Sequence, residues 1–141
     1  MSRGRISSLV SVAVGAGSAV GCDWALRSRW PRQRVGTHAL GLGVAAAIYP
    51  ALRSGEFLGR AGVRELAALG GYSALGVVAV RSGSPTAARV VSGAWASHAL
   101  FDAAHRTGSR SRIPRWYPAL CAGYDLAVAA LIWRGAQAGP R

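Results

Sequence analysis

Residues 116–133 read WYPALCAGYDLAVAALIW, and this run establishes the environment that the chain must occupy. It holds a single formally charged side chain, Asp125. An α-helix needs roughly 17 to 25 residues to cross a hydrocarbon layer of about 30 Å, and the run is long enough. Because it is rich in Ala and Leu without period-two alternation, a helix is favoured over a strand. The stretch therefore predicts a membrane-spanning helix with one ionisable group near its middle.

Four further runs of this kind precede it. The predicted spans cover residues 6–26, 35–52, 61–80, 87–105 and 116–133. Connectors with Arg, Ser, Gly and Pro separate them, as expected for turns among lipid headgroups. We predict an all-α protein, one integral membrane bundle of five transmembrane helices over residues 1–141, with a multi-pass location in the cell membrane. The arginines divide almost equally between the two faces, which gives only a slight preference for a cytoplasmic amino terminus.

The composition excludes other classes. Hydrophobic residues make up 51% of the chain and charged residues 16%, whereas soluble domains carry about 25% charged residues. Two cysteines are too few for a disulfide framework, and the apolar content excludes disorder. All 17 basic residues are arginines in short clusters between apolar runs, which indicates contact with headgroups. Membrane lipids are therefore expected partners, and nucleic acid is not.

The first residues leave one alternative open. Met1–Arg5 and the apolar stretch after it resemble the n- and h-regions of a signal peptide, and Ala19–Cys22 resembles a weak lipoprotein cleavage site. An uncleaved first helix is the simpler expectation.

Ionisable side chains gather in the fourth predicted span. His98, Asp102 and His105 are spaced i, i+4, i+7, so they share one helical face. Each such group costs about 2.5 to 3.5 kcal/mol at mid-membrane and needs a partner or a water-filled pocket. In an antiparallel hairpin, His98 and Asp125 both lie about 10 Å below the same face. The last two helices are therefore predicted to form a polar pocket.

Other side chains are expected at the same face. Glu65 begins the third span at a depth near Asp102, Tyr72 lies further in, and Cys121 precedes Asp125 by one turn. Any of these groups could serve only helix packing, and this holds most for the cysteine and the tyrosine. Their concentration in a chain with 5 acids and 3 histidines favours a functional site.

A second pairing is predicted at the opposite face. Asp23 lies three residues before the end of the first span, and His38 lies three residues into the second. The two side chains should therefore lie at the same depth in their two adjacent helices. We interpret them as a structural ion pair or hydrogen bond, with Arg27 as a further member.

Residues 93–105, GAWASHALFDAAH, precede a proline-containing loop and the sequence CAGYD at 121–125. This pattern resembles the carboxy-terminal half of a family of small, uncharacterised bacterial multi-pass membrane proteins. In that family an H-x3-D-x2-H helix comes before a final helix with Cys and Asp, and Glu65 matches a glutamate early in the preceding helix. Arg106 departs from the family, which has a second consecutive histidine there. The resemblance supports the pocket and implies no activity.

A metal-dependent mechanism fits these residues. His98, Asp102 and His105, with Asp125 as an alternative ligand, could hold a divalent metal such as zinc, which would activate water against a lipid ester or amide. An acid mechanism fits as well. Glu65 or Asp125 would protonate an isoprenoid, as in a terpene cyclase, and His98 with Asp102 would return the proton.

Two sets of residues are candidates for an active site. One set is expected to act in catalysis, and the other consists of aromatic residues expected to contact a hydrophobic small-molecule substrate. They are Glu65, His98, Asp102 and Asp125 for catalysis, and Tyr72, Trp95, Phe101 and Tyr124 for substrate binding. The sequence thus predicts a lipid- or isoprenoid-transforming membrane enzyme, a hydrolase or a cyclase. The alternative is a non-catalytic membrane subunit or a protein that binds protons or cations. In each case the small chain favours a homo-oligomer to enclose a cavity.

Overall fold

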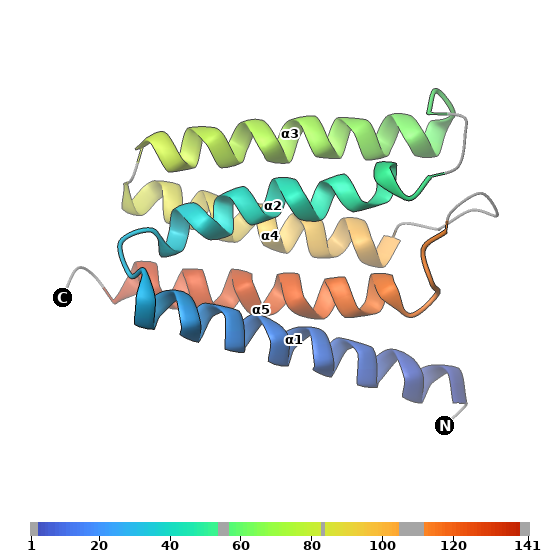
Figure 1. The fold of residues 1–141 in the computed structure, drawn as a ribbon, viewed down its shortest axis with the longest axis horizontal. Helices are drawn as coiled ribbons and strands as arrows, with labels where there is room; N and C mark the ends of the chain where they lie inside the picture. Colours follow the sequence, from blue (N-terminus) through green and yellow to red (C-terminus); the bar gives the residue numbers. More distant parts are fainter. Residues whose placement is uncertain (1–2, 54–56, 83, 105–111, 139–141) are drawn as a thin grey trace.

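A computed structural model describes residues 3–53, 57–82, 84–104 and 112–138. Helices fill these ranges, and no β-strand occurs in this part of the chain. The helices are α1 (Arg3–Arg29), α2 (Arg34–Ala51), α3 (Arg60–Ser82), α4 (Pro85–Ala104) and α5 (Tyr117–Gln137) (Figure 1). The predicted all-α fold with five helices is confirmed.

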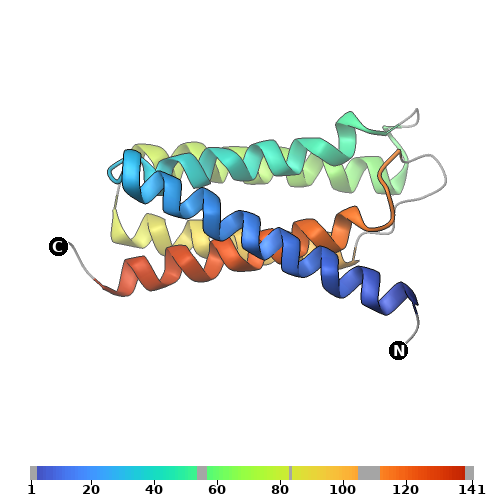
Figure 2. The same cartoon turned by 60° about the horizontal axis from the view of Figure 1, so that its bottom comes forward.

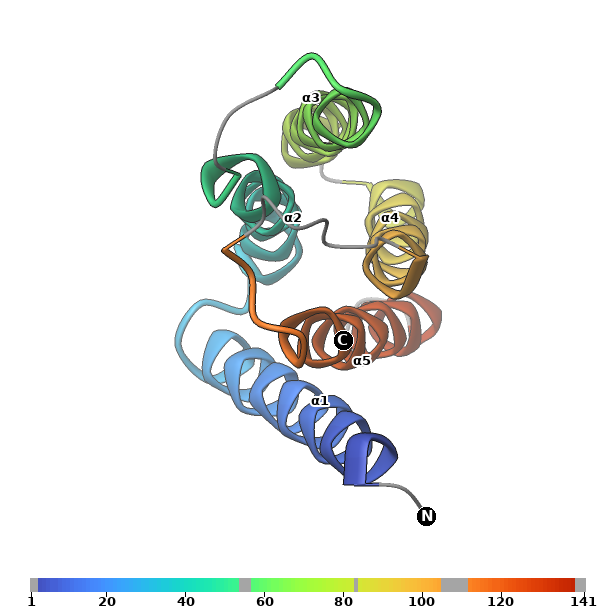
Figure 3. The same ribbon diagram turned by 90° about the vertical axis from the view of Figure 1, so that its right-hand side faces the viewer.

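The helices run back and forth along one direction, so that the two termini lie at opposite ends of the bundle (Figure 1). Seen from one end, α5 lies between α1 and α4, and α2 lies beside α3 (Figure 3). α1 stands outside the other four helices and crosses α5 obliquely (Figure 2). α5 is therefore the main attachment of α1 to the rest of the fold.

Prolines and arginines explain where the helices begin and end. Pro85 opens α4, where its missing N–H would have no helical partner, and the Ser84 hydroxyl accepts a hydrogen bond of 3.1 Å from the Ala87 N–H. Three helices run past the predicted spans and carry an arginine in their last turn, namely Arg29, Arg81 and Arg134. A cation in the last turn is favourable because the carbonyl end of a helix carries partial negative charge.

Glycines let two pairs of helices approach closely. A Cβ added at Gly123 of α5 would overlap the backbone of Val12 in α1, and one at Gly15 of α1 would overlap the Leu120 carbonyl of α5. The pairing of α2 with α3 has the same feature, because Gly76 lies against the Ala39 carbonyl. Small residues at helix crossings are typical of packing in lipid, where association depends on van der Waals contact.

Apolar side chains line both the inside and the outside of the bundle. Leu42, Val91, Val128 and Ile132 are completely buried between the helices. Each helix also exposes a large apolar side chain by more than half, namely Val20, Val44, Val78, Leu100 and Leu126 on α1 to α5. An outer surface of this kind is suited to contact with lipid.

Three helices are long and apolar enough to cross a membrane, over Ser7–Arg29, Arg60–Ser82 and Tyr117–Gln137. This finding supports a membrane location. It includes three of the five membrane-spanning helices that the sequence predicts. α2 and α4 are not among these three helices, and both contain ionisable groups. α2 contains Arg34 and His38, and α4 contains Arg89, His98 and Asp102.

We expect Gly123→Ala to destabilise the protein by about 1 to 3 kcal/mol, because the added methyl group would overlap the Val12 backbone. The matched control is Gly93→Ala on α4, where an added Cβ meets nothing within 4 Å and alanine is the better helix former. Thermal unfolding in detergent micelles measures the stability of both variants. Equal losses of stability in the two variants would contradict the close approach of α1 and α5.

Candidate functional site

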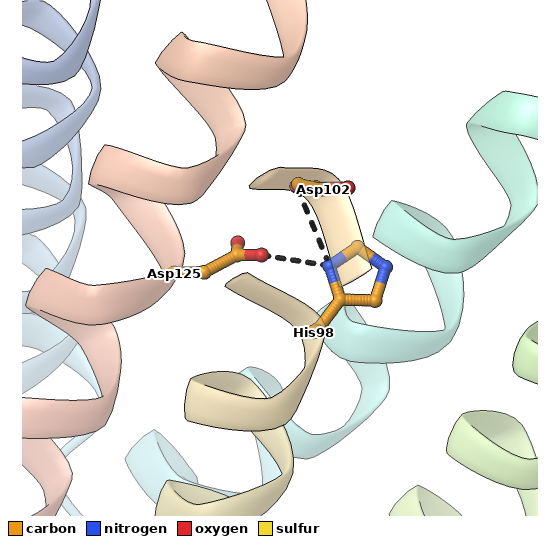
Figure 4. Close-up of side chains that lie close together, drawn as sticks. All are labelled: His98, Asp102 and Asp125. Atoms are coloured by element: carbon orange, nitrogen blue, oxygen red, sulfur yellow. Dashed lines mark hydrogen bonds and ion pairs between the residues drawn. The ribbon is translucent and has the colours of Figure 1, made fainter. Parts of the chain in front are cut away.

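Three ionisable side chains from α4 and α5 converge inside the bundle (Figure 4). His98 and Asp102 lie one turn apart on α4, and Asp125 faces them from α5. Their exposed fractions are 1%, 0% and 1%. We call these three residues the His98 centre. The sequence predicts that His98 and Asp125 lie at the same height in the bundle and can meet, and this prediction is confirmed.

The imidazole of His98 makes both contacts through one nitrogen. His98 Nδ1 lies 2.7 Å from Asp125 Oδ2, a hydrogen bond, and 3.6 Å from Asp102 Oδ2, an ion-pair distance. One ligand atom from each of the three residues can be chosen so that all lie within 4.8 Å of one another. This spacing lets a single cation contact all three side chains after a small adjustment.

Several polar atoms of the centre have no hydrogen bond. Within the described ranges, His98 Nε2 and both Asp102 carboxylate oxygens are buried without a hydrogen-bond partner. A further polar group, the phenol of Tyr49 on α2, interacts electrostatically with Asp102. Buried polar atoms normally have partners, so unpaired ones at one place point to a functional role or to a missing ion.

Aromatic rings surround the imidazole. The ring centres of Tyr72, Phe101 and Trp95 lie 5.0, 5.8 and 6.4 Å from that of His98. Tyr124 packs against Trp95 at 5.9 Å and is one ring further out. The four aromatic residues predicted for substrate binding are thus near the centre, and that role stays a prediction.

Hydrogen bonds hold this aromatic shell in place. The Tyr72 hydroxyl lies 2.9 Å from Ser97 Oγ, which joins α3 to α4. Trp95 Nε1 donates to the His38 carbonyl at 3.1 Å, which joins α4 to α2. The Ser92 hydroxyl donates to the Ala129 carbonyl at 2.8 Å and sets the register of α4 against α5. The centre therefore sits where four helices are tied together.

Glu65 does not belong to the His98 centre. Its carboxylate forms a two-pronged ion pair with Arg53, with 2.6 Å from Arg53 Nε to Oε2, and both side chains are at least nine-tenths buried. The hydrogen bond to Glu65 raises the pKa of the Arg53 guanidinium, which therefore stays charged. The sequence prediction missed Arg53, although this arginine directly follows the second apolar run.

Two further predicted members have different outcomes. Cys121 is a half-buried free thiol on α5, one turn before Asp125, and it is not among the three grouped ligands. His105, a predicted metal ligand, lies outside the residues that the structure describes, so its role stays a prediction.

The predicted pairing of Asp23 with His38 at the other face is confirmed, and the cluster around it has more members than expected. Asp23 accepts hydrogen bonds from Arg27 Nε at 2.7 Å and Arg34 Nε at 2.6 Å, and His38 Nε2 lies 3.0 Å from the same carboxylate. Arg34 also donates to the Leu131 carbonyl of α5 at 2.9 Å. This Asp23 cluster joins α1, α2 and α5, and the sequence prediction missed Arg34.

The chain matches no protein-family model, no curated protein and no solved structure. The resemblance of residues 93–125 to a family of membrane proteins therefore stays a prediction, and the functional argument depends on the residues themselves.

We expect Asp23→Asn to destabilise the protein by about 3 to 5 kcal/mol, because it removes the counter-charge of the buried Arg34. Asp102→Asn is the matched variant, since this carboxylate is equally buried but has no arginine partner among the described residues. It should lose much less stability. The free energy of unfolding in detergent compares the two, and an equal loss would contradict the distinction between the clusters.

Proposed function

We propose that this chain is a multi-pass protein of the cell membrane that crosses the lipid with all five helices. We further propose that it binds a divalent cation at the His98 centre, with zinc as the expected metal. The observation that carries the proposal is the balance of charge at this centre, where two buried carboxylates face one imidazole.

The other buried acids provide the comparison. Glu65 has Arg53 as its counter-charge, and Asp23 has two arginines and His38. With both aspartates ionised, the His98 centre as a whole carries a net charge of about −1 even when the imidazole is protonated. An uncompensated charge in an apolar interior costs several kcal/mol, so a bound cation would stabilise this centre.

The donor set matches what zinc prefers. Imidazole nitrogen and carboxylate oxygen bind zinc at about 2.0 to 2.2 Å, and catalytic zinc sites use three protein ligands and one open position. The proton of the short bond between His98 Nδ1 and Asp125 Oδ2 would be released when the cation enters. The Tyr49 phenol beside Asp102 could orient that carboxylate in the way that outer-sphere partners do.

The arrangement of the helices supports five crossings. The carboxyl ends of α1, α3 and α5 lie at one end of the bundle, and those of α2 and α4 lie at the other (Figure 1). Exposed tryptophans occur at both ends, Trp30 and Trp133 at the first and Trp116 at the second, as is usual at membrane interfaces. α2 and α4 would face lipid with Val44 and Leu100 and keep their polar groups inside.

One observation favours a second candidate function, a lipid- or isoprenoid-transforming enzyme. Asp125 holds His98 through Nδ1, and the opposite nitrogen, Nε2, is buried and unpaired within the described ranges. This is the arrangement of an aspartate-oriented general base. The rings of Tyr72 and Phe101 beside it would suit a hydrophobic substrate. Glu65 takes no part in this arrangement, because its carboxylate is held in the buried ion pair with Arg53.

The zinc content of the detergent-purified protein tests the first proposal. After incubation with zinc and removal of the excess, we expect about one zinc per chain by elemental mass spectrometry, and His98→Ala should remove it. His38→Ala is the matched control, because this equally buried histidine belongs to the Asp23 cluster. A wild-type protein without zinc, or an equal loss in both variants, would contradict the proposal.

Zinc should also stabilise the fold. At a free concentration 100 times the dissociation constant, binding stabilises a folded protein by about 2.7 kcal/mol. We expect the melting temperature of the wild type to rise with zinc and that of Asp102→Asn to stay unchanged. If instead the protein shows hydrolase activity that survives chelation and disappears in His98→Gln, the second candidate is the correct one.

A further inference from the structure

A cavity of about 720 Å³ lies at the end of the bundle away from the His98 centre, where α2 and α4 begin and α3 and α5 end. This volume is within the range of about 300 to 1,000 Å³ that is usual for ligand sites. Its walls include Leu40, Val80 and Ile132, and the first two are about half exposed, so the cavity opens sideways toward the surrounding lipid. Arg32 and Gln33 border it at the turn between α1 and α2.

A second cavity of about 420 Å³ adjoins the first and shares Ala79, Ser84 and Ala87 with it. Its other lining residues are mainly apolar and come from α3 and α4, such as Leu75 and Val90. Both cavities thus lie against the seam between α3 and α4, and the second one adds mainly apolar surface there.

The border of the larger cavity carries excess positive charge. Its lining includes Arg32 and Arg34 and no acidic residue. Arg34 shares the single carboxylate of Asp23 with Arg27, so two guanidinium groups face one acid. Arg32 is exposed and has no ion pair within the ranges that the structure covers. In addition, Gln33 provides no side-chain cap for α2, and the free N–H groups of the first helical turn favour an anion.

Two exposed tryptophans favour a position of this border at the level of the lipid headgroups. Trp30, two residues before Arg32, is 55% exposed, and Trp133 at the end of α5 is 47% exposed. Exposed tryptophans mark the level of the headgroups in membrane proteins. Arg32 would therefore lie near the phosphates, with Leu40, six residues into α2, nearer the acyl chains.

We propose that the larger cavity binds an anionic phospholipid. Its phosphate would contact Arg32 and the uncapped start of α2, and one acyl chain would lie along Leu40, Val80 and Ile132. This site is separate from the His98 centre and does not depend on cation binding there.

The test titrates the full-length protein in detergent with dioleoyl phosphatidylglycerol and, in parallel, with dioleoyl phosphatidylcholine, which has the same chains and no net charge. Native mass spectrometry measures the bound lipid. We expect tighter binding of phosphatidylglycerol, and Arg32→Gln should weaken it about fivefold without changing the binding of phosphatidylcholine. The matched control is Arg29→Gln, an exposed arginine at the same end that does not line the cavity.

A second variant tests the position of the acyl chain. Val80→Phe fills the cavity from a half-exposed position that tolerates a larger side chain, and it should weaken the binding of phosphatidylglycerol. Val77→Phe, on the same helix and in neither cavity lining, should not.

Four outcomes would overturn the proposal. These are equal affinity for the two lipids, equal losses in Arg32→Gln and Arg29→Gln, no effect of Val80→Phe, and displacement of the lipid by millimolar inorganic phosphate. The last outcome would show that the site takes a free anion. Because the arginine variants leave the apolar packing unchanged, they decide the question if Val80→Phe fails to fold.

Discussion

A charge buried in an apolar helix bundle needs a counter-charge, and this constraint organises the structure. All four acidic residues within the described ranges are at most 2% exposed. Two of them have arginine partners that join neighbouring helices, through the Asp23 cluster and the pair of Glu65 with Arg53. At the His98 centre the protein provides fewer positive than negative groups. Stability explains the first two arrangements, and for the third we propose a cation from outside the chain as the counter-charge.

The helix α4 connects this centre to the rest of the fold. Ser92 joins it to α5, Trp95 to α2 and Ser97 to α3. These contacts lie on the turns just before His98, so they fix the rotation of the helix and keep the imidazole pointed at Asp125. A site held on rigid elements in this way needs little rearrangement when a ligand binds.

The sequence predicts the helices and part of the site, for identifiable reasons. Apolar runs and helical spacing determine depth and face, which is why the pairings of Asp23 with His38 and of His98 with Asp125 are confirmed. Spacing does not determine which long side chain folds back onto a buried acid. Arg34 and Arg53 lie at the margins of apolar runs and were therefore assigned to the headgroup region. The cavities depend on how helices cross, which no local pattern encodes.

The close contact of α1 with α5 joins the first helix of the chain to the last. In the proposed membrane arrangement, α1 would enter the bilayer during synthesis while α5 has not yet been made. Its face with Gly15 would then contact lipid until α5 has been inserted, since helices enter the membrane before they associate. Any truncated product that ends before Gly123 lacks the surface that α1 contacts, so the bundle can close only after α5 has been made.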